Sequence, residues 1–169
     1  MIAPEVSRPE PPFQAGEREM LESWLDFHRS TLLWKCAGLD DTQLKQRASA
    51  PSTLTLLGLV RHMTEVEHVW FGRFVGNQEP VPYSSEQRPE ADFEDVDDAD
   101  AAADYAAFER QCARSREWVA GRGLDETFRG RRGHKISLRW IYVHMIEEYA
   151  RHNGHADMIR EAIDGTTGD

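Results

Sequence analysis

The chain has 169 residues and a formal net charge of −10, with 40% hydrophobic and 30% charged residues. This length suits one domain with its own core, and the composition excludes a disordered chain. The acidic charge argues against nucleic acid as the main partner, because phosphate binding needs a basic face. No apolar run approaches the roughly 20 residues that span a bilayer, and the acidic, proline-rich N-terminus does not resemble a signal peptide. We therefore expect a cytoplasmic protein with no membrane or nucleic-acid partner.

Apolar residues recur at the period of an α-helix in four long segments, with one shorter helical segment between the first two. The predicted helices cover residues 17–37, 41–46, 54–75, 98–120 and 138–163. Their expected N-caps, where the residue type suggests one, are Asp40 or Asp41, Ser52 or Thr53, Asp98 or Asp100, and Ser137. Gly38, Gly121 and Gly165 are expected to end three of the long helices, since glycine readily adopts a left-handed conformation.

Two longer connections join these helices. Residues 76–97 contain three prolines and many polar residues, which predicts a long loop of the kind that is often functional or mobile. The acidic stretch 90–104 is interpreted as a solvated loop and helix start. Residues 124–135 are basic and contain glycine, so we expect a connector or a pair of short strands there.

The order of elements contains no internal repeat and no alternation of strands with helices. It predicts an all-α protein, an up-and-down four-helix bundle over residues 15–165. Residues 1–14 are expected to form an extended arm, and residues 166–169 a tail.

The two cysteines, Cys36 and Cys112, lie far apart in the chain and form no C-x-x-C pair. In a reducing cytoplasm we expect two buried free thiols. A catalytic cysteine is the alternative.

The last predicted helix carries His144, Glu148 and His152 at intervals of four residues, and His155 three residues further on. Each step of four turns only about 40° around the helix axis, so these residues share one face. The same face continues in apolar residues, which indicates that it points to the core. A buried carboxylate must be paired or bound to a metal. Either Glu148 pairs with a histidine or arginine inside the bundle, or the face holds a metal ion.

The second long helix offers His62 as a further ligand. Helices commonly hold metals through two residues four apart on one helix and others on a facing helix. Glu65 and Glu67 are either second-shell partners or surface charges, and the surface interpretation is favoured. His68 lies about 120° away from His62 around the axis and is interpreted as a surface or edge histidine. Two histidines and one carboxylate would leave positions open for water or substrate, as a catalytic metal requires.

The stretches GLVRHMTEVEHVWF and SLRWIYVHMIEEYARHNGHADMIRE resemble the two metal-bearing helices of the DinB superfamily. Within it they are most similar to actinobacterial DinB-like proteins related to mycothiol-dependent enzymes. The resemblance covers about residues 17–163. It implies a DinB-like four-helix bundle with a divalent metal held by His62, Glu148 and His152.

The chain departs from the usual superfamily pattern at two positions. Glu148 replaces a histidine ligand, as in the mycothiol-dependent maleylpyruvate isomerase branch, and His155 replaces a glutamine. The resemblance implies zinc as the first choice, with nickel, manganese or iron as alternatives because a carboxylate makes the site harder. His144, His155 and Glu65 are then second-shell residues or substrate contacts. No catalytic residue is expected beyond the metal site.

The resemblance further implies a thiol S-transferase or isomerase that uses mycothiol as co-substrate and acts on a small electrophile. Metal coordination would deprotonate the thiol, and the thiolate would attack. Trp70 and Trp140 either line the cavity or are plain core residues, and the basic segment 129–135 either contacts substrate or is a solvated connector.

Two other functions remain open at this point. One is a metal-dependent hydrolase that uses metal-bound water. The other is a non-enzymatic, metal-stabilised protein of the stress response or an interaction module. A homodimer is also expected, with Trp24 and Phe27 as candidate contacts.

Overall fold

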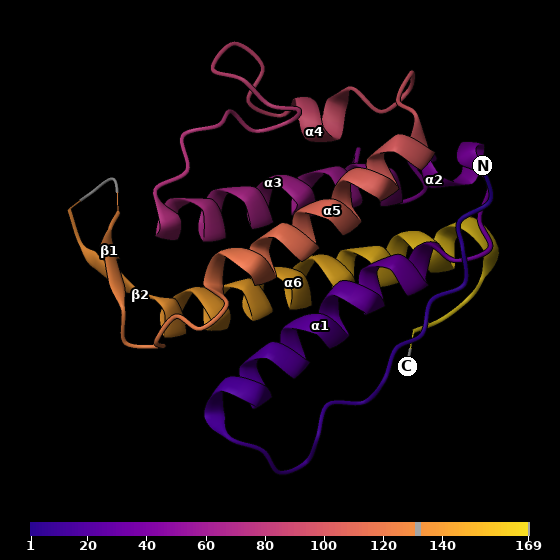
Figure 1. Ribbon diagram of the computed structural model, residues 1–169. Coiled ribbons are helices and arrows are strands. Elements are labelled where there is room, and N and C mark those ends of the chain that lie inside the picture. Colours follow the sequence, from indigo (N-terminus) through magenta and orange to yellow (C-terminus); the bar gives the residue numbers. More distant parts are fainter. Residues whose placement is uncertain (131–132, 169) are drawn as a thin grey trace.

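The computed structural model describes residues 1–130 and 133–168 and is mostly helical (Figure 1). The long helices are α1 (Glu17–Cys36), α3 (Leu56–Val75), α5 (Ala101–Val119) and α6 (Leu138–Asp164). The short elements are α2 (Asp41–Leu44), α4 (Ala91–Glu94), β1 (Thr127–Arg129) and β2 (Lys135–Ser137). The predicted helical class is therefore confirmed, with the addition of a small two-stranded sheet. Within the described part of the chain, none of the helices combines the length and apolar composition that a membrane span requires.

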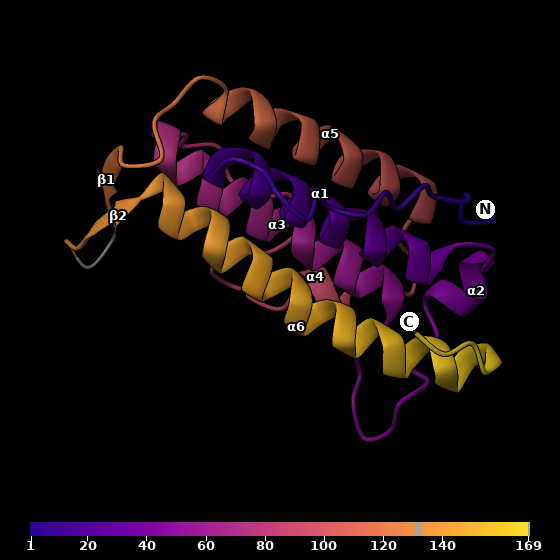
Figure 2. The same cartoon turned by 90° about the horizontal axis from the view of Figure 1, so that it is seen from below.

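The long helices lie side by side in two closely packed pairs (Figures 1 and 2). Helix α6 packs along α1, and α3 packs along α5, while α3 and α6 also contact each other and join the pairs. Side chains from all four long helices fill the core, including Leu25, Leu32, Leu59, Met63, Phe71, Phe108, Met145 and Tyr149. The seam between α3 and α6 is the place where the two predicted metal-bearing helices meet.

The N-caps explain where the helices begin. The Asp100 carboxylate accepts hydrogen bonds from the amides of residues 102 and 103, and the Ser137 hydroxyl accepts one from residue 140, as predicted. The prediction of Ser52 or Thr53 for α3 is wrong, because the Thr55 hydroxyl accepts from the Gly58 amide. The Ser52 hydroxyl instead accepts from the Leu54 amide, which forms a local turn before the helix.

The connector before α6 is an antiparallel hairpin, one of the two predicted alternatives. Phe128 pairs with Ile136 at its centre, and β2 leads directly into α6. Of the basic segment predicted as a possible substrate contact, Arg131 and Arg132 lie outside the described residues.

The N-terminal arm is extended and attaches at its beginning. The Ala3 amide donates to the Leu39 carbonyl over 2.8 Å, and the Gly38 amide donates to the Ala3 carbonyl over 3.0 Å. Further along, the Arg8 guanidinium lies over the rings of Phe27 and Trp34 on α1. The arm therefore covers part of the outer surface of α1.

The segment between α3 and α5 is more ordered than the predicted loop, since it contains α4 and packs across α3. Arg61 on α3 donates hydrogen bonds to the carbonyls of Ala91 (3.2 Å) and Asp92 (3.0 Å). The interpretation of the acidic stretch as solvated is wrong at Asp92 and Asp104, which are only 3% and 6% exposed. Both face α3, where Arg61 also forms an ion pair with Asp104 over 3.2 Å.

Candidate functional site

The predicted ligands His62 and His152 lie close together at the seam between α3 and α6, and the third, Glu148, lies beside His152. The ring centroids of His62 and His152 lie 4.7 Å apart. The Oε2 atom of Glu148 lies 3.6 Å from Nε2 of His152, one helical turn further along α6. His152 is buried, whereas His62 and Glu148 are half-buried, so the group lies at the edge of the core. Two imidazoles from facing helices thus lie next to each other, and the Glu148 carboxylate lies next to one of them.

His62 has a partner that the sequence did not reveal. Its Nδ1 atom lies 2.7 Å from Oδ2 of Asp92 in α4, and its ring stacks on Phe93 with a centroid distance of 4.5 Å. An ionised carboxylate can only accept a hydrogen bond, so Nδ1 donates to it, and in the neutral ring this leaves the lone pair on Nε2. The length of the loop was a signal of function, but its acidic residues were interpreted as solvated, and nothing in the sequence pairs Asp92 with a residue 30 positions earlier.

His152 is neutral at pH 7. Burial, the largest cause, and the nearby His62 and His155 together lower its pKa to about 4. Within the described residues, Nδ1 of His152 and Nδ1 of His155 are buried without a hydrogen-bond partner. The ring centroid of His155 lies 5.4 Å from that of His152. A buried neutral imidazole with an unused nitrogen atom, such as that of His152, is suited to bind a cation.

Glu148 also faces a second group on α6. Its Oε1 atom lies 3.4 Å from Nε2 of His144, whose Nδ1 is 3.5 Å from Glu147. His144, Glu147 and Glu148 offer ligand atoms within 4.8 Å of one another, so they form a competing candidate metal cluster. The Arg151 guanidinium forms ion pairs with both Glu147 and Glu148, so its charge bears on both candidate sets, which share Glu148. We favour the set with His62 because it brings together two imidazoles from facing helices, with ring centroids 4.7 Å apart.

Two tryptophans flank His144 beside this site. The ring centroids of Trp70 and Trp140 lie 4.5 Å and 4.8 Å from that of His144, and 5.2 Å from each other. Trp140 is 46% exposed, so the interpretation of it as a plain core residue is wrong. The three rings form an aromatic shelf, defined here as Trp70, Trp140 and His144, which ends at Glu148.

Three other side chains on α3, interpreted from the sequence as surface groups, are buried in the structure. His68 is buried, with Nδ1 3.3 Å from Oε1 of Gln111 and Nε2 3.1 Å from the Glu79 carbonyl, so it is not a surface histidine. Glu65 is also buried, and its Oε1 accepts hydrogen bonds from the backbone amides of residues 83 and 84. Glu67 is fully buried in an ion pair with Arg29. These side chains are enclosed because α3 contacts α5, α6 and the α4 segment.

The two cysteines are buried free thiols, as predicted. Burial raises the pKa of Cys36 to about 11 and that of Cys112 to about 12. A thiol that is protonated and shielded from solvent is a poor nucleophile. The alternative of a catalytic cysteine is therefore disfavoured.

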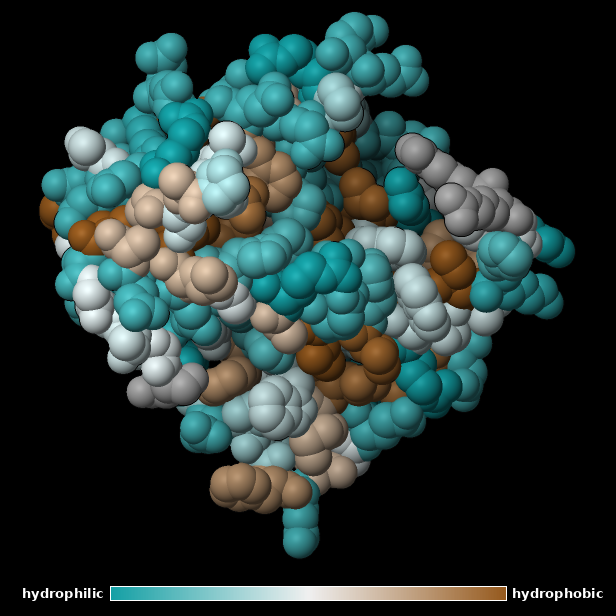
Figure 3. Space-filling model, turned by 180° about the vertical axis from the view of Figure 1, so that it is seen from behind, coloured by the Kyte–Doolittle hydropathy of each residue, from teal (hydrophilic) through white to brown (hydrophobic). Residues whose placement is uncertain are grey.

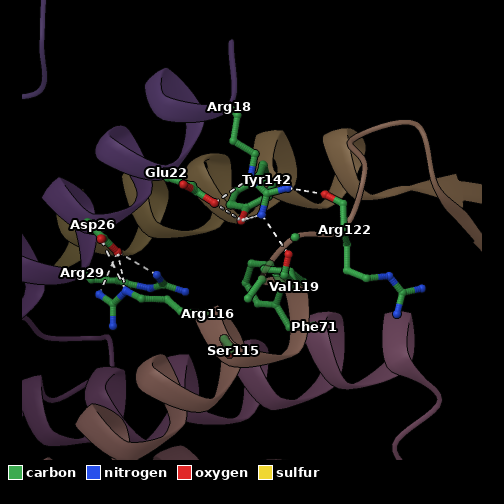
Figure 4. Close-up of a pocket in the computed structure, with 12 residues that line it drawn as sticks. Arg18, Glu22, Asp26, Arg29, Phe71, Ser115, Arg116, Val119, Arg122 and Tyr142 are labelled. Atoms are coloured by element: carbon green, nitrogen blue, oxygen red, sulfur yellow. Dashed lines mark hydrogen bonds and ion pairs between the residues drawn. The ribbon is translucent and has the colours of Figure 1, made fainter. Parts of the chain in front are cut away.

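Two cavities lie outside the ligand cluster. One, of about 540 Å³, lies between α1 and α5 (Figure 4). It is lined by Asp26 and Arg116, which pair with each other, and by Tyr142, so its charged groups satisfy one another. The other, of about 1130 Å³, is a groove between α3, the hairpin and the segment after α3. It includes Val69, two helical turns from His62 on the same side of α3.

The molecular surface around these features is mixed in character. Figure 3 shows hydrophobic areas separated by hydrophilic side chains on the face that is seen from behind. Exposed large hydrophobic residues on α6 include Trp140, Val143 and Met158. The ligand cluster, which is half-buried at His62 and Glu148, thus lies near the exposed ring of Trp140.

Comparison with known proteins identified a family for the chain. The family model described as mycothiol-S-transferase matches residues 20–165, which include both helices that carry the predicted ligands. No curated protein and no solved structure matches the chain. The resemblance to the DinB superfamily is thereby confirmed. The chain belongs to the mycothiol S-transferase family, a member of the DinB-like superfamily.

Proposed function

We propose that α1, α3, α5 and α6 form a DinB-like up-and-down bundle in which His62, Glu148 and His152 hold one divalent metal ion. The protein then acts as a mycothiol-dependent S-transferase on a small electrophile. The observation that carries the proposal is the 4.7 Å separation of the His62 and His152 rings, with Glu148 beside them. Family membership supports the transferase class.

The donor set fits a divalent ion. Burial lowers the pKa of His152 and favours the neutral imidazole that a metal requires, and the contact of His62 Nδ1 with Asp92 leaves Nε2 as the nitrogen that would bind the ion. The Glu148 carboxylate supplies one negative charge. Three protein ligands leave at least one coordination position open, as in catalytic zinc sites.

Zinc is the first choice for two nitrogen ligands and one oxygen ligand, and nickel, manganese or iron are the alternatives. When bound, the ion would lower the pKa of a coordinated thiol, so that the co-substrate would be a thiolate at neutral pH. No protein nucleophile is then needed, which agrees with the buried, protonated state of Cys36 and Cys112.

The aromatic shelf is a suitable surface for the rest of the co-substrate. Mycothiol is a sugar-based thiol, and the exposed Trp140 ring offers a flat surface next to Glu148. His144 lies between this surface and the carboxylate, so it could contact polar groups of the thiol or fix the position of Glu148. His155 lies beside His152, so it would likewise contact the co-substrate or hold His152 in position.

The family match favours transfer over the hydrolase and the non-enzymatic alternatives. The proposal also implies a reducing cytoplasm, where a free thiol co-substrate would be available.

A homodimer stays a prediction. Trp24 is 42% exposed and remains a candidate contact, whereas Phe27 is half-buried beside Arg8 of the arm.

The test measures conjugation of mycothiol to a chloro-dinitroarene by metal-loaded protein. We expect activity that falls to the rate of the metal-free protein in His152→Ala. The matched control is His134→Ala, which removes an exposed histidine on the hairpin. Equal rates for wild type, metal-free protein and His152→Ala would reject the proposal.

A further inference from the structure

The contact between His62 and Asp92 joins two elements that are distant in the chain. His62 lies on α3, and Asp92 lies in the four-residue helix α4. The Nδ1–Oδ2 distance of 2.7 Å is short for a hydrogen bond between these atoms, as expected when the acceptor is charged. The Asp92 side chain is almost completely removed from solvent.

Asp92 differs from its acidic neighbours. Asp95 and Asp97 are exposed and form ion pairs with Arg88 and Arg47 at the surface. Asp92 instead points inward, and its Oδ1 atom is buried without a hydrogen-bond partner in the described part of the chain. Burying a carboxylate costs free energy, so solubility or surface charge does not explain why Asp92 lies here. Its only described side-chain partner is His62.

Neighbouring residues on α3 hold this segment in place. Arg61, next to His62 in the chain, donates to the carbonyls of Ala91 and Asp92, and its guanidinium lies 4.1 Å from the centroid of the Tyr83 ring. Glu65, one turn further along, accepts hydrogen bonds from the amides that begin the same segment. The Asp92 carboxylate is therefore fixed by its backbone, independently of its contact with His62.

We propose that Asp92 is a positioning residue for His62. It keeps the proton on Nδ1 and holds the ring so that Nε2 is presented to the metal ion. Carboxylates that accept from the second nitrogen of a ligating histidine raise the basicity of the ligand and fix its orientation. This inference rests on the proposed metal centre.

The rival interpretation is that Asp92 only attaches α4 to α3. A purely structural contact would affect stability, but it would leave the metal affinity and the protonated nitrogen of His62 unchanged. Asp92→Asn removes the charge and keeps the size, and Asp92→Ala removes the acceptor. The control is Asp98→Asn, which makes the same charge change at an exposed position six residues later.

The first measurement is metal affinity by competition with a chromogenic chelator, with zinc as the probe. We expect Asp92→Ala to weaken zinc binding by about 10–100-fold, Asp92→Asn to weaken it less, and Asp98→Asn to leave it unchanged. Wild-type affinity in both Asp92 variants would overturn this inference and leave the proposed metal centre intact. A wild-type protein that binds no zinc would overturn both.

The second measurement needs no metal and no activity. Long-range ¹H–¹⁵N correlation spectra of the histidine rings identify which nitrogen carries the proton when the ring is neutral. We expect Nδ1–H for His62 in the wild type and a shift toward Nε2–H in Asp92→Ala. The unchanged tautomer in a folded Asp92→Ala protein would contradict the positioning role, and Asp92→Asn serves if the alanine variant does not fold.

Discussion

Arg29 and Glu67 form a two-fold hydrogen-bonded ion pair in the core. Both Nε and Nη2 of Arg29 lie 2.7 Å from the carboxylate oxygens of Glu67, and both side chains are removed from solvent. The Tyr149 hydroxyl donates to the same carboxylate over 3.0 Å. The pair connects α1 to α3, and Tyr149 adds α6 to the network.

Breaking this pair on one side should destabilise the protein strongly. Arg29→Ala leaves the Glu67 carboxylate buried without its cation, and we expect a loss of about 3–5 kcal/mol in the free energy of unfolding. Replacing both residues with apolar ones of similar size should cost much less. Urea denaturation measures these values. The matched control is Arg47→Ala, whose ion pair with Asp97 is exposed, and an equally small effect for both variants would contradict this account.

The start of α3 can be tested through its cap. Thr55→Ala removes the hydroxyl that accepts from the Gly58 amide, and we expect a loss of about 1 kcal/mol in the free energy of unfolding. Ser52→Ala is the control, because its hydroxyl serves the preceding turn. A larger loss from Ser52→Ala than from Thr55→Ala, measured by thermal or urea denaturation, would place the start of the helix earlier.

The thiols provide a test of burial and ionisation. The pKa values of Cys36 and Cys112, raised to about 11 and about 12 by burial, keep both thiols protonated at pH 8. We expect slow alkylation by iodoacetamide in the folded protein and rapid alkylation of both in urea. Rapid reaction of either cysteine in the folded protein, followed by mass spectrometry, would revive the alternative of a catalytic cysteine.

His28 predicts part of the pH dependence of stability. Burial lowers its pKa below the ordinary value of 6.5, so between these two pKa values the unfolded chain binds more protons than the folded one. The contribution of His28 to the free energy of unfolding is therefore fully present above pH 6.5 and is lost as the pH drops below that value. His28→Asn should make the decline between pH 7 and 5 less steep, as measured by urea denaturation at each pH. The exposed-site variant His134→Asn should keep the wild-type slope, and an equal slope for His28→Asn would refute the prediction.

The sequence predicted the features that depend on neighbouring residues. The helical period identified all four long helices, and the local caps Asp100 and Ser137 were read correctly because a cap bonds to amides two or three residues away. The shared face of Glu148 and His152 follows from their spacing in the same way. The family match then supported the resemblance on which the assignment of His62 depends.

Contacts between distant segments could not be predicted in this way. Asp92 and Glu67 look like ordinary helix or loop charges, and only the packing of α4 and α1 against α3 brings them to His62 and Arg29. The cap at Thr55 was missed for a related reason, because serine and threonine residues at 52, 53 and 55 are all good caps. The fold decides which of them meets a free amide.

The most direct test of the metal centre is a crystal structure of the metal-loaded protein with anomalous diffraction recorded at the absorption edges of zinc, nickel, iron and manganese. We expect one anomalous peak within bonding distance of His62 Nε2, His152 and the Glu148 carboxylate, with Asp92 still hydrogen-bonded to Nδ1 of His62. A peak at His144, Glu147 and Glu148 with His62 unbound would contradict it, as would the absence of any peak.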